Sequence, residues 1–153
     1  MILNWDQYFM GVATLSGMRS KDPNTQVGAC IVNDKRRIVG IGYNGFPVGC
    51  NDNDFPWGNS GEYLDTKYPY VVHAEANAIL NSTTSLENCT LYVNLFPCNE
   101  CAKLIIQSGI KQIVYGADKY KHLDSTKASK RMLKSAGVTT RVIPDVSIGI
   151  TAC

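Results

Sequence analysis

Two short motifs in this chain combine residue types that bind zinc. The first is His-Ala-Glu at residues 73–75, and the second is Pro-Cys-Asn-Glu-Cys at residues 97–101. Two cysteines separated by two residues at the start of a helix can direct both sulfurs to one metal ion. With His73, Cys98 and Cys101 as ligands, a tetrahedral zinc ion keeps its fourth position open. An open position is typical of catalytic rather than structural zinc.

Glu75 follows the predicted ligand His73 by two residues, so we expect it to lie beside the metal without binding it. A carboxylate there can accept a proton from water and deliver it to a substrate. Zinc supplies complementary chemistry, because it lowers the pKa of a water molecule toward about 7. Helix N-termini stabilise thiolates, which favours metal binding where both motifs open helices. The motifs therefore predict metal-assisted hydrolysis, with Glu75 as the catalytic residue.

Each motif by itself has a simpler interpretation. A Cys-x-x-Cys pair can be redox-active or half of a structural zinc site, and an isolated His-x-Glu has little meaning. A closed structural site needs a fourth ligand, but the other four cysteines are scattered and form no second pair. We expect Cys30 and Cys89 to be small buried hydrophobic residues. Cys50 is a weaker candidate for a second metal site, and His122 is expected in a surface turn.

The first half of the chain supplies a helix, a hairpin and a long loop. Apolar residues repeat at helical spacing over residues 5–20, with Asn4 as the N-cap. Two short apolar runs at 27–32 and 38–43 predict a β-hairpin. Residues 44–70 are rich in Gly, Pro and aromatic residues without periodicity, so we expect a long ordered loop. Loops of that length in a compact domain are commonly functional.

The second half alternates between helices and strands of about ten and five residues. This alternation predicts βαβ units with right-handed crossovers. We therefore expect an α/β fold: a three-layer αβα sandwich around a five-stranded mixed sheet, mostly parallel, with an antiparallel first hairpin. Residues 1–153 are expected to form a single domain with a C-terminal tail at 144–153. The predicted elements are helices at 73–81, 99–108 and 125–136 and strands at 90–95, 112–116 and 139–143.

Composition narrows the possible partners. The 153 residues include 15 basic and 13 acidic side chains spread along the chain, for a net charge of +2. Nucleic-acid binding usually needs a concentrated basic face, so the charge pattern favours a small substrate over a polymer. No apolar run reaches the ~20 residues that span a bilayer, and the N-terminus lacks the pattern of a signal peptide. We expect no membrane partner and a reducing, cytoplasmic location.

Longer stretches around these motifs resemble the deoxycytidylate deaminase family. They are Ser-Lys-Asp-Pro-Asn-Thr-Gln-Val-Gly-Ala at 20–29, Gly-Ile-Gly-Tyr-Asn-Gly-Phe-Pro at 40–47, the residues at 68–75 and those at 91–115. His-x-Glu with Pro-Cys-x-x-Cys is shared by the whole cytidine-deaminase-like superfamily. The longer stretches are similar to the branch that acts on dCMP. The resemblance implies hydrolysis of dCMP to dUMP and ammonia with Zn²⁺, supplying dUMP for thymidylate synthesis.

The resemblance also implies which residues contact the nucleotide. Asn44 matches an asparagine that contacts the sugar, although Asn before Gly also simply favours a turn. The backbone of Ala74 would hold the carbonyl of the base. The other implied substrate-binding residues are Asn24, Thr25, Phe96, Pro97 and Tyr120, and the segment 20–25 with Tyr120 lies where the family binds the phosphate and the ribose. This chain reads Asp-Lys-Tyr-Lys-His at 118–122, one residue longer than the family's Asp-Lys-Tyr-His, so Lys119 and Lys121 fit a phosphate contact or a solvated turn equally well.

Members of the family are often homohexamers that dCTP activates with Mg²⁺ and that dTTP inhibits. By resemblance, the nucleotide effector site lies near Asn44, Gly45, Phe46 and Pro47.

Three other functions compete with this prediction: a tRNA-editing adenosine deaminase, a deaminase of free nucleosides, and a zinc-stabilised interaction module without chemistry. The first needs an electropositive RNA-binding face, the second would not need a 5′-phosphate, and the third would not need Glu75.

Overall fold

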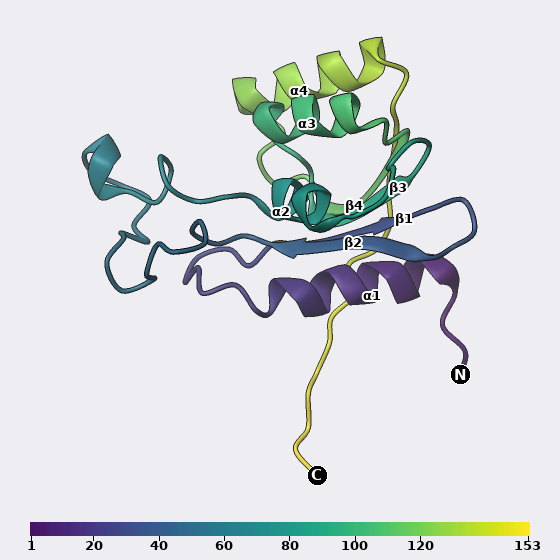
Figure 1. Cartoon of the computed structure of the whole chain (residues 1–153), viewed down its shortest axis with the longest axis horizontal. Helices are drawn as coiled ribbons and strands as arrows, with labels where there is room; N and C mark the ends of the chain where they lie inside the picture. The colour runs from purple at the N-terminus through teal and green to yellow at the C-terminus, as the bar shows by residue number, and fades with distance from the viewer.

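The structure, a computed structural model, describes residues 1–153 and consists of a five-stranded sheet between two layers of helices. Figure 1 shows α1 on one face of the sheet and α2, α3 and α4 on the other. The strands lie in the order β2-β1-β3-β4-β5. This is the predicted αβα sandwich. The helices are α1 (Trp5–Gly17), α2 (Ala74–Asn81), α3 (Asn99–Ser108) and α4 (Asp124–Ser135). The strands are β1 (Gly28–Val32), β2 (Ile38–Tyr43), β3 (Thr90–Leu95), β4 (Gln112–Ala117) and β5 (Thr139–Val142).

The sheet has as many antiparallel as parallel strand pairings, so the prediction of a mostly parallel sheet was wrong. β3 pairs with β4 and β4 with β5 in parallel, whereas β1 is antiparallel to both β2 and β3. The hairpin therefore contributes two antiparallel pairings, because β1 lies between β2 and β3. The parallel half places the ends of β3 and β4 at one edge, where α3 begins.

Two apolar clusters lie on the two faces of the sheet. The larger one joins the sheet to α2, α3 and α4 and includes the buried residues Ile31, Leu91 and Ile105. The smaller one joins the sheet to α1 through Phe9, Met10 and neighbouring residues. Cys30 and Cys89 are almost completely buried, as predicted.

α1 begins as predicted but ends earlier. The Asn4 side chain accepts from the backbone N–H of Gln7, and the Gln7 side chain accepts from the N–H of Asn4, which forms a capping box. The helix ends at Gly17 rather than at residue 20. The backbone then turns into the sheet, and this turn buries Ser20 and Asp22.

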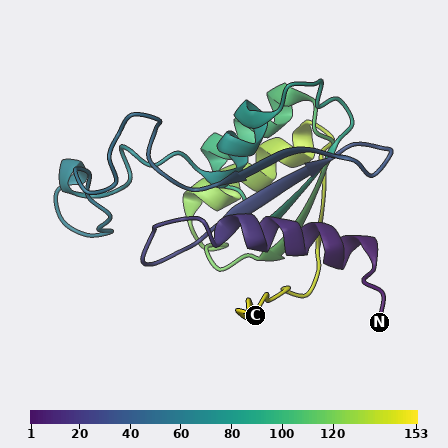
Figure 2. The same ribbon diagram turned by 60° about the horizontal axis from the view of Figure 1, so that its bottom comes forward.

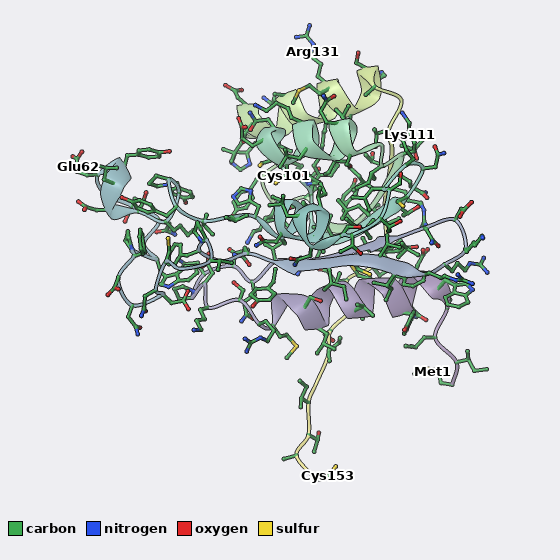
Figure 3. All side chains as sticks on the ribbon, in the orientation of Figure 1. Met1, Glu62, Cys101, Lys111, Arg131 and Cys153 are labelled. Carbon is green, nitrogen blue, oxygen red and sulfur yellow. The ribbon has the colours of Figure 1, made fainter.

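The predicted loop at 44–70 is ordered by its own contacts. Gly45 and Val72 exchange backbone hydrogen bonds of 3.0 and 2.7 Å across its root. The rings of Phe46 and Trp57 lie 4.1 Å apart, and Phe55 joins them. Farther out, Lys67 N donates to the carbonyl of Gly58 at 2.9 Å and closes an exposed tip that holds a short 3-10 helix, Tyr63–Asp65. Figures 1 and 3 show this loop projecting from the sandwich, with Glu62 at its far end.

The tail from residue 144 has no regular secondary structure, and Figure 2 shows it running beneath the sheet on the same side as α1. Val146 packs against the smaller apolar cluster. None of the helices combines the length and the apolar character needed to cross a membrane.

Candidate metal centre and nucleotide cavity

The N-termini of α2 and α3 bring the two sequence motifs together. His73 is the N-cap of α2 and Cys98 is the N-cap of α3, and neither side chain caps its own helix. Both side chains are therefore free to bind something else. Cys101 lies in the first turn of α3 and is 2% exposed. Figure 3 shows Cys101 in the region where α2 and α3 meet.

The geometry of the three side chains fits tetrahedral zinc. Nδ1 of His73 lies 3.4 Å from the sulfur of Cys98 and 3.4 Å from that of Cys101. All three ligand atoms lie within 4.8 Å of one another. Nitrogen and sulfur ligands on one tetrahedral zinc ion are separated by roughly 3.6 Å, given the usual bond lengths. His73, Cys98 and Cys101 are thus placed as three ligands of one ion. No other group of three or more His, Cys, Asp or Glu side chains in the chain is arranged this way.

The electrostatics of the cluster favour a thiolate at Cys98. A hydrogen bond from the Cys101 thiol, together with one from His73, lowers the pKa of Cys98 to about 4. The hydrogen bond to Cys98, followed by burial, raises the pKa of Cys101, because a second thiolate would stand beside the first. The hydrogen bond to Cys98 raises the pKa of His73. A divalent cation removes this competition, since it can accept both thiolates and a neutral imidazole.

Glu75 lies in the first turn of α2, where it is 4% exposed. Burial raises the pKa of its carboxyl group above the usual range, whereas the charge of His73 acts in the opposite direction. Glu75 lines the same cavity as two members of the metal cluster, His73 and Cys98. The side chain is therefore available for proton transfer there.

A cavity of about 280 Å³ opens beside the cluster. It is bounded by His73, Glu75 and Cys98 on the side of the metal cluster. Five of the predicted substrate-binding residues also line it: Thr25, Asn44, Ala74, Phe96 and Tyr120. The structure thus brings together segments that are far apart in the sequence.

Two predicted substrate-binding residues lie outside the cavity lining. Asn24 is exposed, and its backbone N–H is held in a turn by the Asp22 carboxylate. Pro97 is fully buried. The predicted effector residues Gly45, Phe46 and Pro47 also do not line the cavity, because they form the root of the projecting loop.

Asn44 is both a cavity residue and a structural link. Its side-chain oxygen accepts from Val27 N at 2.9 Å, and its amide donates to the carbonyl of Thr25 at 3.0 Å. It is 6% exposed. The amide therefore fixes the segment before β1 against the end of β2, so Asn44 does more than favour a turn.

The sequence analysis did not identify several residues of the cavity wall. Lys67, which had no motif, forms a buried ion pair with Asp22 of the segment 20–25, which the resemblance had placed near the nucleotide. The first turn of α4 contributes Ser125 and Thr126, which have no motif of their own. For Asp22, the signals were the resemblance of the segment 20–25 and the Asp-Pro pairing, which favours a turn.

The remaining candidates lie apart from the metal cluster. Cys50 is partly exposed in the projecting loop and joins no metal-binding group. His122 is exposed in the turn before α4, as predicted. In that turn, Lys119 Nζ lies 3.4 Å from the Thr25 hydroxyl and 5.0 Å from the centre of the Tyr120 ring.

This fold, with a His-Cys-Cys cluster and a buried glutamate at two converging helix N-termini, defines an α/β enzyme of the cytidine-deaminase-like class. A family model described as the cytidine and deoxycytidylate deaminase zinc-binding region matches residues 3–117. The chain belongs to this family, which confirms the resemblance inferred from the sequence motifs, and it is an enzyme of the deaminase type.

Several known deaminases are similar to this protein over most of its length. Human deoxycytidylate deaminase is 59% identical over 141 residues, which cover 91% of this chain and 79% of the human protein. The probable deoxycytidylate deaminase of Drosophila melanogaster is 59% identical over 143 residues, which cover 89% of this chain and 70% of the fly protein. The crystal structure of dCMP deaminase from cyanophage S-TIM5 in complex with dCMP and dUMP superposes with a TM-score of 0.74 at 28% identity. That alignment covers 94% of this chain and 99% of the phage protein.

Proposed function

We propose that this enzyme hydrolyses dCMP to dUMP and ammonia with zinc as its cofactor. The observation that carries the proposal is the His73-Cys98-Cys101 cluster, whose members His73 and Cys98 line the same cavity as the buried residue Glu75. Human deoxycytidylate deaminase, at 59% identity, supports dCMP as the substrate.

Each residue of the cluster has a defined task in this reaction. His73, Cys98 and Cys101 would hold the zinc ion, which when bound would supply Lewis-acid activation of a water molecule beside carbon 4 of cytosine. Glu75 accepts the two protons of the attacking water one after the other: it delivers the first to the ring nitrogen, and the second, taken from the oxygen now on carbon 4, to the departing amino group. The oxygen of the water remains on carbon 4, and the amino group leaves as ammonia. Burial of Glu75 keeps the carboxylate away from bulk water during these transfers.

The rest of the cavity wall binds the nucleotide. The backbone of Ala74, next to His73, holds the carbonyl of the base, and Phe96 provides an apolar surface beside it. The Phe96 ring is fixed by an edge-on contact with Tyr115, with ring centres 4.9 Å apart. Asn44 contacts the sugar, and Thr25 and Tyr120 lie toward the phosphate. Asn24 and Pro97 act indirectly, because they shape the turns that carry Thr25 and Cys98.

A steady-state assay of ammonia release tests the proposed substrate. The assay compares dCMP, CMP, deoxycytidine and dCTP with the zinc-loaded enzyme. We expect rapid turnover of dCMP and at least 100-fold lower kcat/KM for deoxycytidine, because the missing phosphate removes charge-assisted hydrogen bonds. Equal turnover of deoxycytidine would instead identify a nucleoside deaminase. Turnover of an adenosine in a tRNA stem-loop, with none of dCMP, would identify an RNA-editing enzyme.

We further propose that the enzyme is regulated as the family resemblance implies. In this proposal dCTP with Mg²⁺ activates and dTTP inhibits, and both bind near Asn44, Gly45, Phe46 and Pro47 in a cytoplasmic homohexamer that supplies dUMP for thymidylate synthesis. The aromatic contacts at the root of the projecting loop support this placement, since they offer a base a stacking surface. Rates with and without each effector, together with the mass of the particle by light scattering, test the proposal. An effector-insensitive monomer would contradict it.

A further inference from the structure

The cavity wall contains a buried ion pair that the proposed reaction does not use. Lys67 Nζ lies 2.6 Å from Oδ2 of Asp22, and the two side chains are 11% and 1% exposed. Both residues line the cavity that His73 and Cys98 of the metal cluster also line. Removing two charges from water costs about as much as their attraction returns, so a buried pair is weak evidence of stabilisation. Because the pair lies in the cavity wall, its charged groups are placed to contact a bound ligand.

The Asp22 carboxylate has no capacity left for a ligand. Its Oδ1 accepts from Asn24 N at 2.8 Å and from Thr25 N at 3.2 Å. Its Oδ2 accepts from Lys67 Nζ and, at 3.4 Å, from the amide of Asn44. A carboxylate has about four acceptor sites, and four donors occupy them here. Asp22 is therefore a fixed anchor for its neighbours rather than a contact for the substrate.

The Lys67 ammonium, in contrast, keeps donors available. An ammonium group has three N–H donors, and the only hydrogen bond it makes within the protein is to Asp22. The Lys67 backbone is held as well, because its N–H donates to Gly58 and its carbonyl accepts from Tyr70 and Val71. The ammonium is thus fixed in position, and Asp22 balances its charge. A fixed donor of this kind suits an oxygen acceptor on a bound molecule.

We infer that Lys67 is a specificity-determining residue that donates to an oxygen of the sugar–phosphate part of the nucleotide. Asp22 holds the ammonium in place for this contact. The inference rests on the proposed deamination of dCMP and adds a residue that selects this substrate. The acceptor is a phosphate oxygen or the 3′-hydroxyl oxygen, since both can accept a hydrogen bond from an ammonium group.

The test removes the pair as a unit. Lys67→Met alone would leave a buried, uncompensated Asp22, so the main variant is Lys67→Met/Asp22→Asn, which removes both charges at similar volume. Asp52→Asn is the matched control, because Lys21 and Asp52 join the same two segments through an exposed bridge of 2.6 Å. Each protein is assayed with dCMP, with deoxycytidine, and with 2′,3′-dideoxycytidine 5′-monophosphate. Within one protein, the ratios of kcat/KM among these substrates do not depend on the fraction of correctly folded enzyme.

We expect kcat/KM for dCMP to fall by roughly 10- to 100-fold in the double variant, the usual effect of losing a hydrogen bond to a charged group. Asp52→Asn should keep the wild-type ratios. If the preference for dCMP over deoxycytidine falls, the acceptor is a phosphate oxygen. If the preference over the dideoxynucleotide falls, the acceptor is the 3′-hydroxyl. Ratios equal to those of the wild type would overturn the inference, whereas a wild-type enzyme that deaminates none of the three would instead overturn the proposed function.

Discussion

Glu75 is the residue on which the proposed proton transfers depend. It is buried in the first turn of α2, two residues beyond the proposed metal ligand His73. Its short distance from His73 in the sequence explains how a single helical turn can carry both a ligand and a base. This arrangement separates the binding of the metal from the movement of protons, so the two can be removed independently.

We predict that Glu75→Gln lowers kcat for dCMP by about 10²- to 10⁴-fold, because the amide retains the shape of the side chain but cannot accept the proton. Zinc content, measured by atomic emission, should stay at the wild-type level, since Glu75 is not a ligand. A matched change outside the cavity, Glu100→Gln, should keep full activity. Wild-type turnover by Glu75→Gln would remove Glu75 from the reaction.

At the scale of secondary-structure elements, α2 lies unusually close to β2. A Cβ added at Gly42 would lie 2.3 Å from the backbone N of Ala78 and 2.5 Å from the carbonyl oxygen of Ala74. The Asn77 amide also donates to the carbonyl of Tyr43 at 2.8 Å. The position of α2, and with it the position of the metal ligand at its N-terminus, therefore depends on a residue without a side chain in the neighbouring strand.

Gly42→Ala should consequently displace α2 and disturb the metal site without changing any residue in it. We expect a loss of about 1 to 3 kcal/mol in the free energy of unfolding. We also expect a decrease of about tenfold or more in kcat/KM, because small misplacements of catalytic groups are costly. Chemical denaturation and the dCMP assay measure the two effects. Gly149→Ala, where the added carbon meets no atom within 4 Å, is the control. Full activity in Gly42→Ala would show that α2 can move without consequence.

A second link between elements joins α1 to β5 and β3. The Asp6 carboxylate accepts two hydrogen bonds from the Arg141 guanidinium, at 2.7 and 2.8 Å, and one from the Tyr92 hydroxyl at 2.7 Å. The bonds to Arg141, followed by the bond from Tyr92, lower the pKa of Asp6 below its usual value. A lowered folded-state pKa stabilises the fold above the unfolded pKa of about 3.9 and ceases to do so as the pH falls through the folded value.

Asp6→Asn should therefore reduce the free energy of unfolding by about 1 kcal/mol at pH 7, in the range measured for partly exposed pairs and hydrogen bonds. The difference from the wild type should shrink as the pH falls below about 4, where wild-type Asp6 also loses its charge. Urea titrations at pH 7, 5 and 3 measure this. Lys103→Gln, which removes an exposed bridge to Glu100, should have little effect at any pH. A pH-independent difference would show that the charge of Asp6 is not the cause.

The elements themselves could be predicted because each has a strong local signal. Helical periodicity and the Asn4 cap indicated α1, and Gly109 and Gly137 marked the ends of α3 and α4 with φ angles of 88° and 75°. The end of α1 was missed because Gly17, where the helix ends, lies against the backbone of Val27 and Gly28, a tertiary contact that has no local signal. The metal cluster, in contrast, could be predicted from local sequence, because its three proposed ligands belong to two compact motifs.

At the scale of the whole molecule, the metal cluster connects two helices that otherwise meet through few side chains. His73 caps α2, whereas Cys98 and Cys101 belong to α3, so a bound ion would cross-link the two. Binding to the folded state alone stabilises that state by mass action. A bound metal would therefore contribute to stability as well as to chemistry.

We predict that removal of zinc with a chelator lowers the melting temperature by about 10 °C, which corresponds to roughly 4 kcal/mol for an ion present at 1,000 times its dissociation constant. Differential scanning calorimetry before and after dialysis against the chelator measures the shift. Cys98→Ser should melt at the lower temperature and not respond to the chelator, whereas Cys50→Ser, in the projecting loop, should respond like the wild type. An unchanged melting temperature in the wild type would mean that no ion links α2 to α3.

The double closure of the projecting loop has a consequence for how the chain can acquire new parts. Gly45 and Val72 join its root, the bond between Lys67 and Gly58 closes it again, and residues 58–65 beyond this second closure are all exposed. Gly61, at a φ of 109°, has no atom within 4 Å of the position of an added Cβ. A peptide or a whole module could be inserted there without changing the positions in space of the residues that line the cavity. The tip is thus the point at which evolution or an engineer can lengthen this enzyme while the reaction centre keeps its geometry.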